Sequence, residues 1–115
     1  MKIEGEGKLI TIFIGEADKI DHRPLYEVIV LTARETGMAG ATVLRGVAGY
    51  GARSRIHTAK ILRLSEDLPL IIELVDTAEK IDGFVQTVGE LFEKSGCGGL
   101  ITEERAGIIR YSSGK

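Results

Sequence analysis

The spacing of apolar positions changes several times along the chain, and each change marks a predicted element. Residues 8–15 (KLITIFIG) are rich in β-branched and aromatic side chains and end on glycine, which is typical of a strand. A polar connection over residues 16–23 follows. Pro24 then suits a first helical position, apolar residues recur at helical spacing after it, and Gly37 is a candidate C-cap. The first third of the chain therefore predicts a strand followed by a helix.

The middle of the chain predicts a short strand and then a long loop. The strand covers residues 41–47 and is broken by the glycine-rich tract 46–51. Residues 52–68 show no firm period and favour a loop, in which residues 58–64 resemble a strand. A loop of this length inside a compact domain is usually functional or disordered.

The last third repeats the strand and helix pattern. Residues 70–76 form an apolar run of strand length, and Thr77 is a candidate N-cap for a helix that residues 94–99 end. Two further strand signals follow, at residues 100–103 and 107–111, with a short polar break between them.

The order β-α-β, long loop, β-α-β predicts the fold class. Two such halves in a chain of this size favour an α+β, ferredoxin-like βαββαβ sandwich, with a four-stranded antiparallel sheet and two helices on one face. The expected organisation is a single domain over residues 1–115, with residues 52–68 as a long loop.

Composition narrows the class of protein. The 115 residues are 43% hydrophobic and carry a net charge of −2, which is ordinary for one soluble globular domain. No apolar run approaches the length that crosses a bilayer, and no secretory signal is visible. One cysteine, Cys97, allows neither an internal disulfide nor a cysteine-rich zinc site. We therefore expect a cytoplasmic protein without membrane insertion.

Charge is concentrated in the middle of the chain. Between Thr36 and Ser65 there is no acidic residue, whereas five arginine and lysine residues occur there. An acidic protein with one basic segment favours a local anionic ligand over a nucleic-acid surface, because nucleic-acid-binding domains are usually basic overall. The alternative is a solvated loop whose arginines pair with acids elsewhere.

Two glycine-rich turns are the main candidates for ligand binding. Residues 45–55 (RGVAGYGARSR) and 96–99 (GCGG) could offer backbone N–H groups to an anion, and arginines flank the first turn. The alternatives are a tight turn or bulge for the first and a helix stop for the second. Neither turn matches a Walker A loop, and the glycine spacing at 46, 49 and 51 is the reverse of the dinucleotide fingerprint.

Catalytic constellations are mostly absent from the sequence. His22 and His57 have no partnered cysteine to form a zinc site, and no histidine near Cys97 marks it as a nucleophile. Glu73 differs because it interrupts an apolar strand, where a carboxylate must be paired or face a site. Ligand contact and an interface ion pair both remain open for it.

The combination of GATVLRG at residues 40–46, GYG at 49–51 and LPLIIELVD at 68–76 resembles domain-of-unknown-function family 190, whose proteins are P-II-like. Matching features extend from about Leu9 to Tyr111. That family is similar to the nitrogen regulatory P-II signalling proteins. These are ferredoxin-like homotrimers that bind ATP or ADP between subunits, and their long mobile loop docks on partner proteins.

The resemblance implies an adenine-nucleotide site between subunits. Residues 49–51 match the P-II turn, residues 52–68 the mobile loop, residues 96–99 the second phosphate loop, and Arg110 the late basic residues that reach the phosphates. No catalytic residue and no metal ligand are assigned. The candidate nucleotide-binding residues are Arg45, Gly46, Gly49, Tyr50, Gly51, Arg53, Glu73, Gly96, Gly98, Gly99 and Arg110.

This sequence departs from the P-II pattern in places that concern the ligand. Ala52-Arg53-Ser54 stands where P-II proteins have a glutamine and a lysine, and Leu100 stands where a lysine follows the second turn. Bound ADP or ATP is the expected ligand, while binding of magnesium or 2-oxoglutarate is left open.

Three hypotheses follow for the function. The favoured one is a non-enzymatic adenine-nucleotide sensor, in which nucleotide held in a homotrimer changes the 52–68 loop and a protein partner recognises that change. The others are a slow nucleotide hydrolase and an interaction module without a small ligand.

Overall fold

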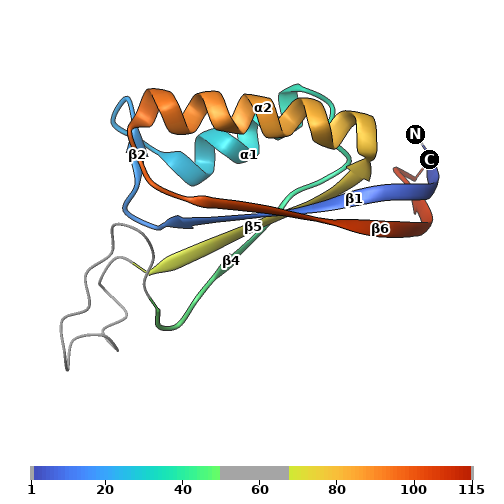
Figure 1. Cartoon of the computed structure of the whole chain (residues 1–115), viewed down its shortest axis with the longest axis horizontal. Helices are drawn as coiled ribbons and strands as arrows, with labels where there is room; N and C mark the ends of the chain where they lie inside the picture. The colour runs from blue at the N-terminus through green and yellow to red at the C-terminus, as the bar shows by residue number, and fades with distance from the viewer. Residues whose placement is uncertain (1, 50–67, 115) are drawn as a thin grey trace.

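In the computed structural model, which describes residues 2–49 and 68–114, two helices lie across one face of a four-stranded sheet (Figure 1). The sheet has the spatial order β4-β5-β1-β6, and each neighbouring pair is antiparallel. This is the expected ferredoxin-like βαββαβ arrangement. The elements are β1 (Lys2–Gly15), β2 (Lys19–Ile20), β3 (Arg23–Pro24), α1 (Leu25–Glu35), β4 (Thr42–Arg45), β5 (Pro69–Thr77), α2 (Ala78–Ser95) and β6 (Leu100–Ser112).

The core lies between the sheet and the helices. Alternate residues of β1 and β5 point toward the helices, and each helix turns one apolar stripe toward the sheet. The buried residues of this layer include Ile10, Ile12, Ile14, Leu70, Ile72, Leu74, Leu25, Ile29, Ile81, Phe84 and Val88. Both helices of the described residues lie on this one face, and none of them covers the other face of the sheet (Figure 1).

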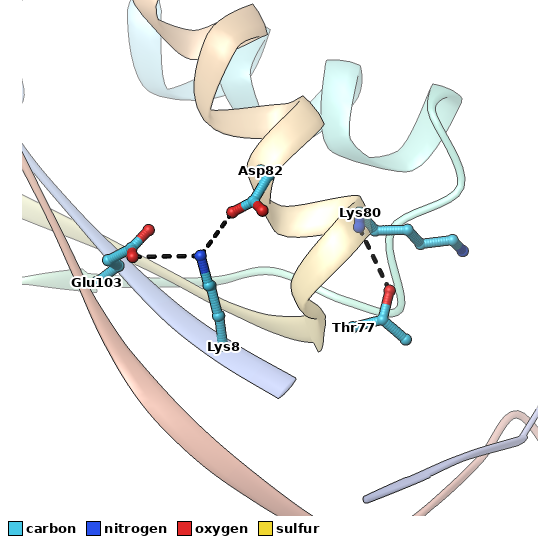
Figure 2. Close-up of polar contacts among 5 residues, drawn as sticks. All are labelled: Lys8, Thr77, Lys80, Asp82 and Glu103. Carbon is cyan, nitrogen blue, oxygen red and sulfur yellow. Dashed lines mark hydrogen bonds and ion pairs between the residues drawn. The ribbon is translucent and has the colours of Figure 1, made fainter. Parts of the chain in front are cut away.

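Both helices end where the sequence predicts. Gly37 has a φ of 81°, and the backbone N–H groups of Gly37 and Met38 donate to the carbonyls of Arg34 (3.2 Å) and Ala33 (3.0 Å). This is a Schellman motif, and it confirms Gly37 as the residue that stops α1. Pro24 is the N-cap of α1 rather than its first helical residue. At the start of α2, the Thr77 hydroxyl accepts the Lys80 N–H at 3.3 Å, which confirms the predicted N-cap (Figure 2).

An ion-pair cluster joins β1, α2 and β6. The Lys8 ammonium lies between the carboxylates of Asp82, at 2.7 Å, and Glu103, at 3.3 Å (Figure 2). Its hydrogen bonds to Asp82 and then to Glu103 raise the pKa of Lys8 above 10.5. The three side chains are partly or largely exposed, so solvent screens their attraction.

The structure corrects the sequence prediction at three places. The first strand begins at Lys2 instead of residue 8, because its polar first half pairs with the end of β6. The last strand is continuous, since Glu104–Ala106, expected to form a break, pair with residues 7–9 of β1. The connection over residues 16–23 contains the β2–β3 hairpin. Its two turn residues, Asp21 and His22, have positive φ values, as a type I′ turn requires.

The remaining strands differ from prediction only at their ends. β4 is shorter than the expected 41–47, because Gly46 turns away after its N–H donates to the Pro69 carbonyl at 2.8 Å. β5 is one residue longer at each end than the expected 70–76. Apart from Leu68, the predicted 52–68 loop lies outside the described residues, as does the strand-like stretch 58–64.

Candidate functional site

The two glycine-rich turns lie at the same end of the sheet but on opposite edges. The first follows β4, and the second precedes β6. Register places the end of β4, the start of β5, the end of β1 and the start of β6 side by side at this end. Three strand spacings separate the two edges, which is about 14 Å. The described part of the first turn, residues 45–49, therefore does not contact the second turn within one chain.

The first turn packs closely against the start of β5. A Cβ added at Gly46 would stand 2.8 Å from Cγ of Pro69, and one added at Gly49 would stand 3.2 Å from the same atom. The alternative of a tight, packed turn therefore accounts for glycine at both positions. Arg45, the last residue of β4, forms an ion pair with Glu16, the residue after β1. The Arg45 guanidinium is thus held at this end of the sheet, and its side chain is 61% exposed.

The second turn combines a helix stop with a close contact. Gly96 has a φ of 72°, and its N–H donates to the Phe92 carbonyl at 2.9 Å, which confirms the helix-stop interpretation for this residue. A Cβ at Gly99 would lie 2.7 Å from the Phe92 ring and 3.0 Å from the carbonyl oxygen of Phe13. Gly98 lies between Gly96 and Gly99, in the short connection from α2 to β6.

Glu73 lies on the uncovered face of the sheet, beside a hollow. It pairs in register with Thr42 of β4 and Thr11 of β1 and is half-buried. The hollow has a volume of about 300 Å³ and is lined by Leu9, Ala39, Gly40, Ala41, Thr42, Glu73, Val75 and Tyr111. Among the described residues, no lysine or arginine forms an ion pair with Glu73. Because a carboxylate only accepts hydrogen bonds, this hollow suits a ligand group that donates them.

Three side chains fix the segment that forms one wall of the hollow. Asp76 is fully buried, and its carboxylate accepts the N–H of Ala39 at 2.8 Å and that of Thr77 at 2.7 Å. The Tyr111 hydroxyl donates to the Ala39 carbonyl at 3.2 Å. The Lys80 ammonium donates to the Gly37 carbonyl at 2.9 Å.

Sequence reasoning missed Asp76 and Tyr111 as residues near the site. Strand alternation carried a signal for Asp76, because it shares the inward face of β5 with Ile72 and Leu74. No such signal existed for Tyr111, whose partner, Ala39, is 72 residues away.

The remaining candidates are scattered. Arg110 lies near the end of β6, about 30 Å of strand away from the second turn. A bulge occurs beside it, where Ile109 and Arg110 oppose the single residue Glu4. Tyr50, Gly51 and Arg53 lie outside the described residues.

Other sites for ligands are sparse in the part of the chain that the structure describes. Over residues 2–49 and 68–114, no three His, Cys, Asp or Glu residues gather as metal ligands would. In the same ranges, no helix has the length and apolar character needed to cross a membrane. A second hollow, of about 460 Å³, lies over the start of α2 and is lined by Thr36, Met38, Thr77, Glu79, Lys80, Gly83, Phe84 and Thr87.

The fold is that of the PII-like proteins. The structure of CPII from Thiomonas intermedia K12, bound to ADP and bicarbonate, matches with a TM-score of 0.63 over 96% of this chain and 91% of CPII, at 16% identity. CPII bound to ADP, AMP and bicarbonate, and described as a nitrogen regulatory PII-like protein, matches with a TM-score of 0.60 over 100% of both chains, at 14% identity. At these identities the likeness concerns the fold alone.

The sequence matches identify the family. The model of DUF190, described as "Uncharacterized ACR", matches residues 7–108, so the chain belongs to this family. A UPF0166 protein of Aquifex aeolicus (strain VF5) is 36% identical over 102 residues, which are 89% of this chain and 92% of the relative. A UPF0166 protein of Methanocaldococcus jannaschii is 35% identical over 91 residues, covering 79% and 83% of the two chains. The resemblance to the P-II-like family 190 is thereby confirmed.

Proposed function

We propose that this protein is a non-enzymatic regulatory protein that binds an adenine nucleotide between the subunits of a homotrimer. The observation that carries the proposal is the position of two features along β5. The hollow beside Glu73 lies near the middle of this strand, and the first glycine turn packs against its first residue, Pro69. ADP bound to CPII, a protein of the same fold, supports the choice of ligand.

The spacing of these features fits a nucleotide. Glu73 is four residues from Pro69, which is about 13 Å along a strand and comparable with the length of a nucleoside diphosphate. The hollow would take the base, because the adenine amino group is a donor and the Glu73 carboxylate an acceptor. The phosphates would lie at the end of the sheet, near Arg45 and the backbone N–H groups of the turn.

A neighbouring subunit would complete the phosphate site. The second glycine turn, with Gly96, Gly98 and Gly99, lies on the opposite edge of the sheet, and Arg110 lies at the far end of β6. A second copy of the chain could bring these groups to the β4 edge of the first. Arg53 and the GYG residues at 49–51 would contribute from the first turn, and the 52–68 loop would transmit the bound state to a protein partner.

The uncovered face of the sheet supports self-association. Leu44, Val75 and Leu100 are exposed on it, at 48%, 40% and 56%. Leu44 and Val75 lie in neighbouring strands, and Leu100 lies in β6, three strands from Leu44. An apolar sheet face of this kind is usually covered, and the trimer would cover it.

Calorimetric titration of nucleotide-stripped protein tests the proposal. ATP, ADP, AMP and GTP are titrated with and without magnesium, and the solution mass is measured beside them. We expect micromolar binding of an adenine nucleotide, at one site per subunit of a trimer. Absence of binding by ATP, ADP and AMP would refute the nucleotide assignment.

Substitution of Glu73 locates the site. Glu73→Ala removes a charged hydrogen-bond partner worth about 1.5–3 kcal/mol, so adenine-nucleotide affinity should fall roughly 10- to 150-fold. Glu90→Ala, which removes an exposed carboxylate of α2, is the matched control and should leave affinity unchanged. Equal loss in both variants would contradict a specific role for Glu73.

A further inference from the structure

The backbone of Ala39 is held from both sides at the wall of the Glu73 hollow. We propose that Asp76 and Tyr111 are positioning residues, which fix Ala39 and thereby set the affinity of this hollow for its ligand. The inference rests on the proposed nucleotide function and adds two residues to it. Neither residue needs to touch the ligand for this role, because both act through the backbone of Ala39.

We call the hydrogen bonds from Asp76 and Tyr111 to the backbone of Ala39 the clamp, and Asp76 forms its first half. Its side chain is 0% exposed, and a buried carboxylate is costly unless its oxygens are hydrogen-bonded. One oxygen accepts the Thr77 N–H at the start of α2, and the other accepts the Ala39 N–H across 37 positions of sequence. The carboxylate therefore ties the segment before β4 to the junction of β5 and α2. An apolar residue here would fill the core without making this connection.

Tyr111 completes the clamp from the last strand. Its hydroxyl donates to the Ala39 carbonyl at 3.2 Å, so the two polar backbone groups of Ala39 are both occupied. Tyr111 also lines the hollow itself. The end of β6 and the end of β5 thus hold the same residue from opposite sides.

The held segment needs such support because its own sequence constrains it little. Gly40 directly follows Ala39 and Gly37 lies two residues before it, and a Cβ at either glycine would meet no atom within 4 Å. Glycine loses more backbone freedom on ordering than any other residue. If the clamp loosens, the hollow keeps its binding shape for a smaller fraction of the time. The apparent affinity falls in proportion to that fraction.

The variant Tyr111→Phe tests the inference, because it keeps the ring and removes only the hydroxyl. Tyr26→Phe is the matched control, since Tyr26 is a half-buried tyrosine of α1 that packs against the core. Hydrogen exchange at the Ala39 amide and calorimetric titration with ADP are measured for both variants, well below their unfolding temperatures. Loss of one neutral hydrogen bond predicts about 2- to 12-fold weaker ADP binding for Tyr111→Phe, with faster exchange at Ala39. The control should change neither quantity.

The outcomes separate this inference from the proposed function. If wild-type protein binds ADP and Tyr111→Phe binds it equally well, the positioning role is wrong and the nucleotide function stands. If exchange at Ala39 is unchanged in Tyr111→Phe, the clamp itself is wrong. If wild-type protein binds no adenine nucleotide, both proposals fall.

A second variant examines the other half of the clamp. Asp76→Asn keeps the side-chain volume but presents an amide NH₂ where one acceptor oxygen stood, so it can satisfy only one of the two backbone N–H groups. We expect weaker ADP binding and faster Ala39 exchange in the folded variant. Folded Asp76→Asn with wild-type affinity would overturn the role of Asp76.

Discussion

The ion pair between Arg45 and Glu16 predicts that a substitution which breaks it will raise nucleotide affinity. If Arg45 contacts phosphate, Glu16 competes with the ligand for its guanidinium. Replacing Glu16 with Gln should therefore strengthen binding, although it removes an interaction from the free protein. A role for Arg45 in structure alone predicts no gain.

The magnitude follows from the exposure of the pair. The side chains of Arg45 and Glu16 are 61% and 29% exposed, and exposed ion pairs are typically worth about 0.2–1 kcal/mol. Releasing Arg45 from Glu16 should raise affinity for ADP by about 1.4- to 5-fold. Arg45→Ala removes the charged donor and should lower affinity by roughly 10- to 150-fold.

Calorimetric titration with ADP measures all these variants, together with the double variant. Because Glu16 acts through Arg45, Glu16→Gln should have no effect once Arg45 is Ala. Asp82→Asn is the charge-matched control, since it breaks another exposed ion pair near the start of α2, which follows the end of β5 opposite Arg45, and it should leave affinity unchanged. Unchanged or weaker ADP binding by Glu16→Gln would refute the reasoning. An equal gain of ADP affinity in Asp82→Asn would show that loss of any negative charge has this effect, without a role for the Arg45 ion pair.

Two further predictions concern stability. Gly99→Ala places a Cβ 2.7 Å from the Phe92 ring, so we expect a loss of about 1–3 kcal/mol, measured by urea unfolding; a wild-type midpoint would contradict the close packing. The second concerns Lys8, whose pKa is raised above 10.5 first by its hydrogen bond to Asp82 and then by that to Glu103. A folded-state pKa above the unfolded value stabilises the protein below pH 10.5, and this contribution disappears as pH rises through the folded value. Unfolding curves of wild-type and Lys8→Met protein should therefore converge at high pH; a gap that stays constant up to pH 11 argues against the linkage.

The fold could be predicted in outline because its main elements have local signals. Alternating or continuous apolar runs marked β1 and β5. The helix ends were set by the positive φ of Gly37 and Gly96 and by the hydroxyl of Thr77, which accepts a backbone hydrogen bond. Such signals need no knowledge of distant residues.

The errors came from elements that depend on distant partners. The polar start of β1 and the charged middle of β6 have no strand signal of their own. The first forms a ladder because it lies beside the end of β6, and the second because it lies beside residues 8–10 of β1. The Asp21–His22 turn was missed because neither residue is a glycine, although both have positive φ values.

The candidate site was less predictable than the fold. Sequence reasoning identified Glu73 because a carboxylate in an apolar strand requires an explanation, and the structure places it beside a hollow. It could not identify the Ala39 wall, whose shape depends on contacts with Asp76 and Tyr111 across 37 and 72 positions. Strand alternation alone cannot show which loop a buried carboxylate will hold.

In the two glycine-rich turns, the presence of glycine supports a binding site less strongly than the position of the turns on the sheet does. Gly46 and Gly99 are required by contacts with Pro69 and Phe92, so each would be glycine even in a protein that binds nothing there. What favours a ligand is that both turns lie at one end of the sheet, on the two edges that have no neighbouring strand among residues 2–49 and 68–114. Under the proposed function, a ligand that touches both turns lies where two chains meet. Nucleotide binding and assembly are then thermodynamically linked. Assembly raises the affinity for nucleotide by the same factor by which bound nucleotide raises the affinity between subunits.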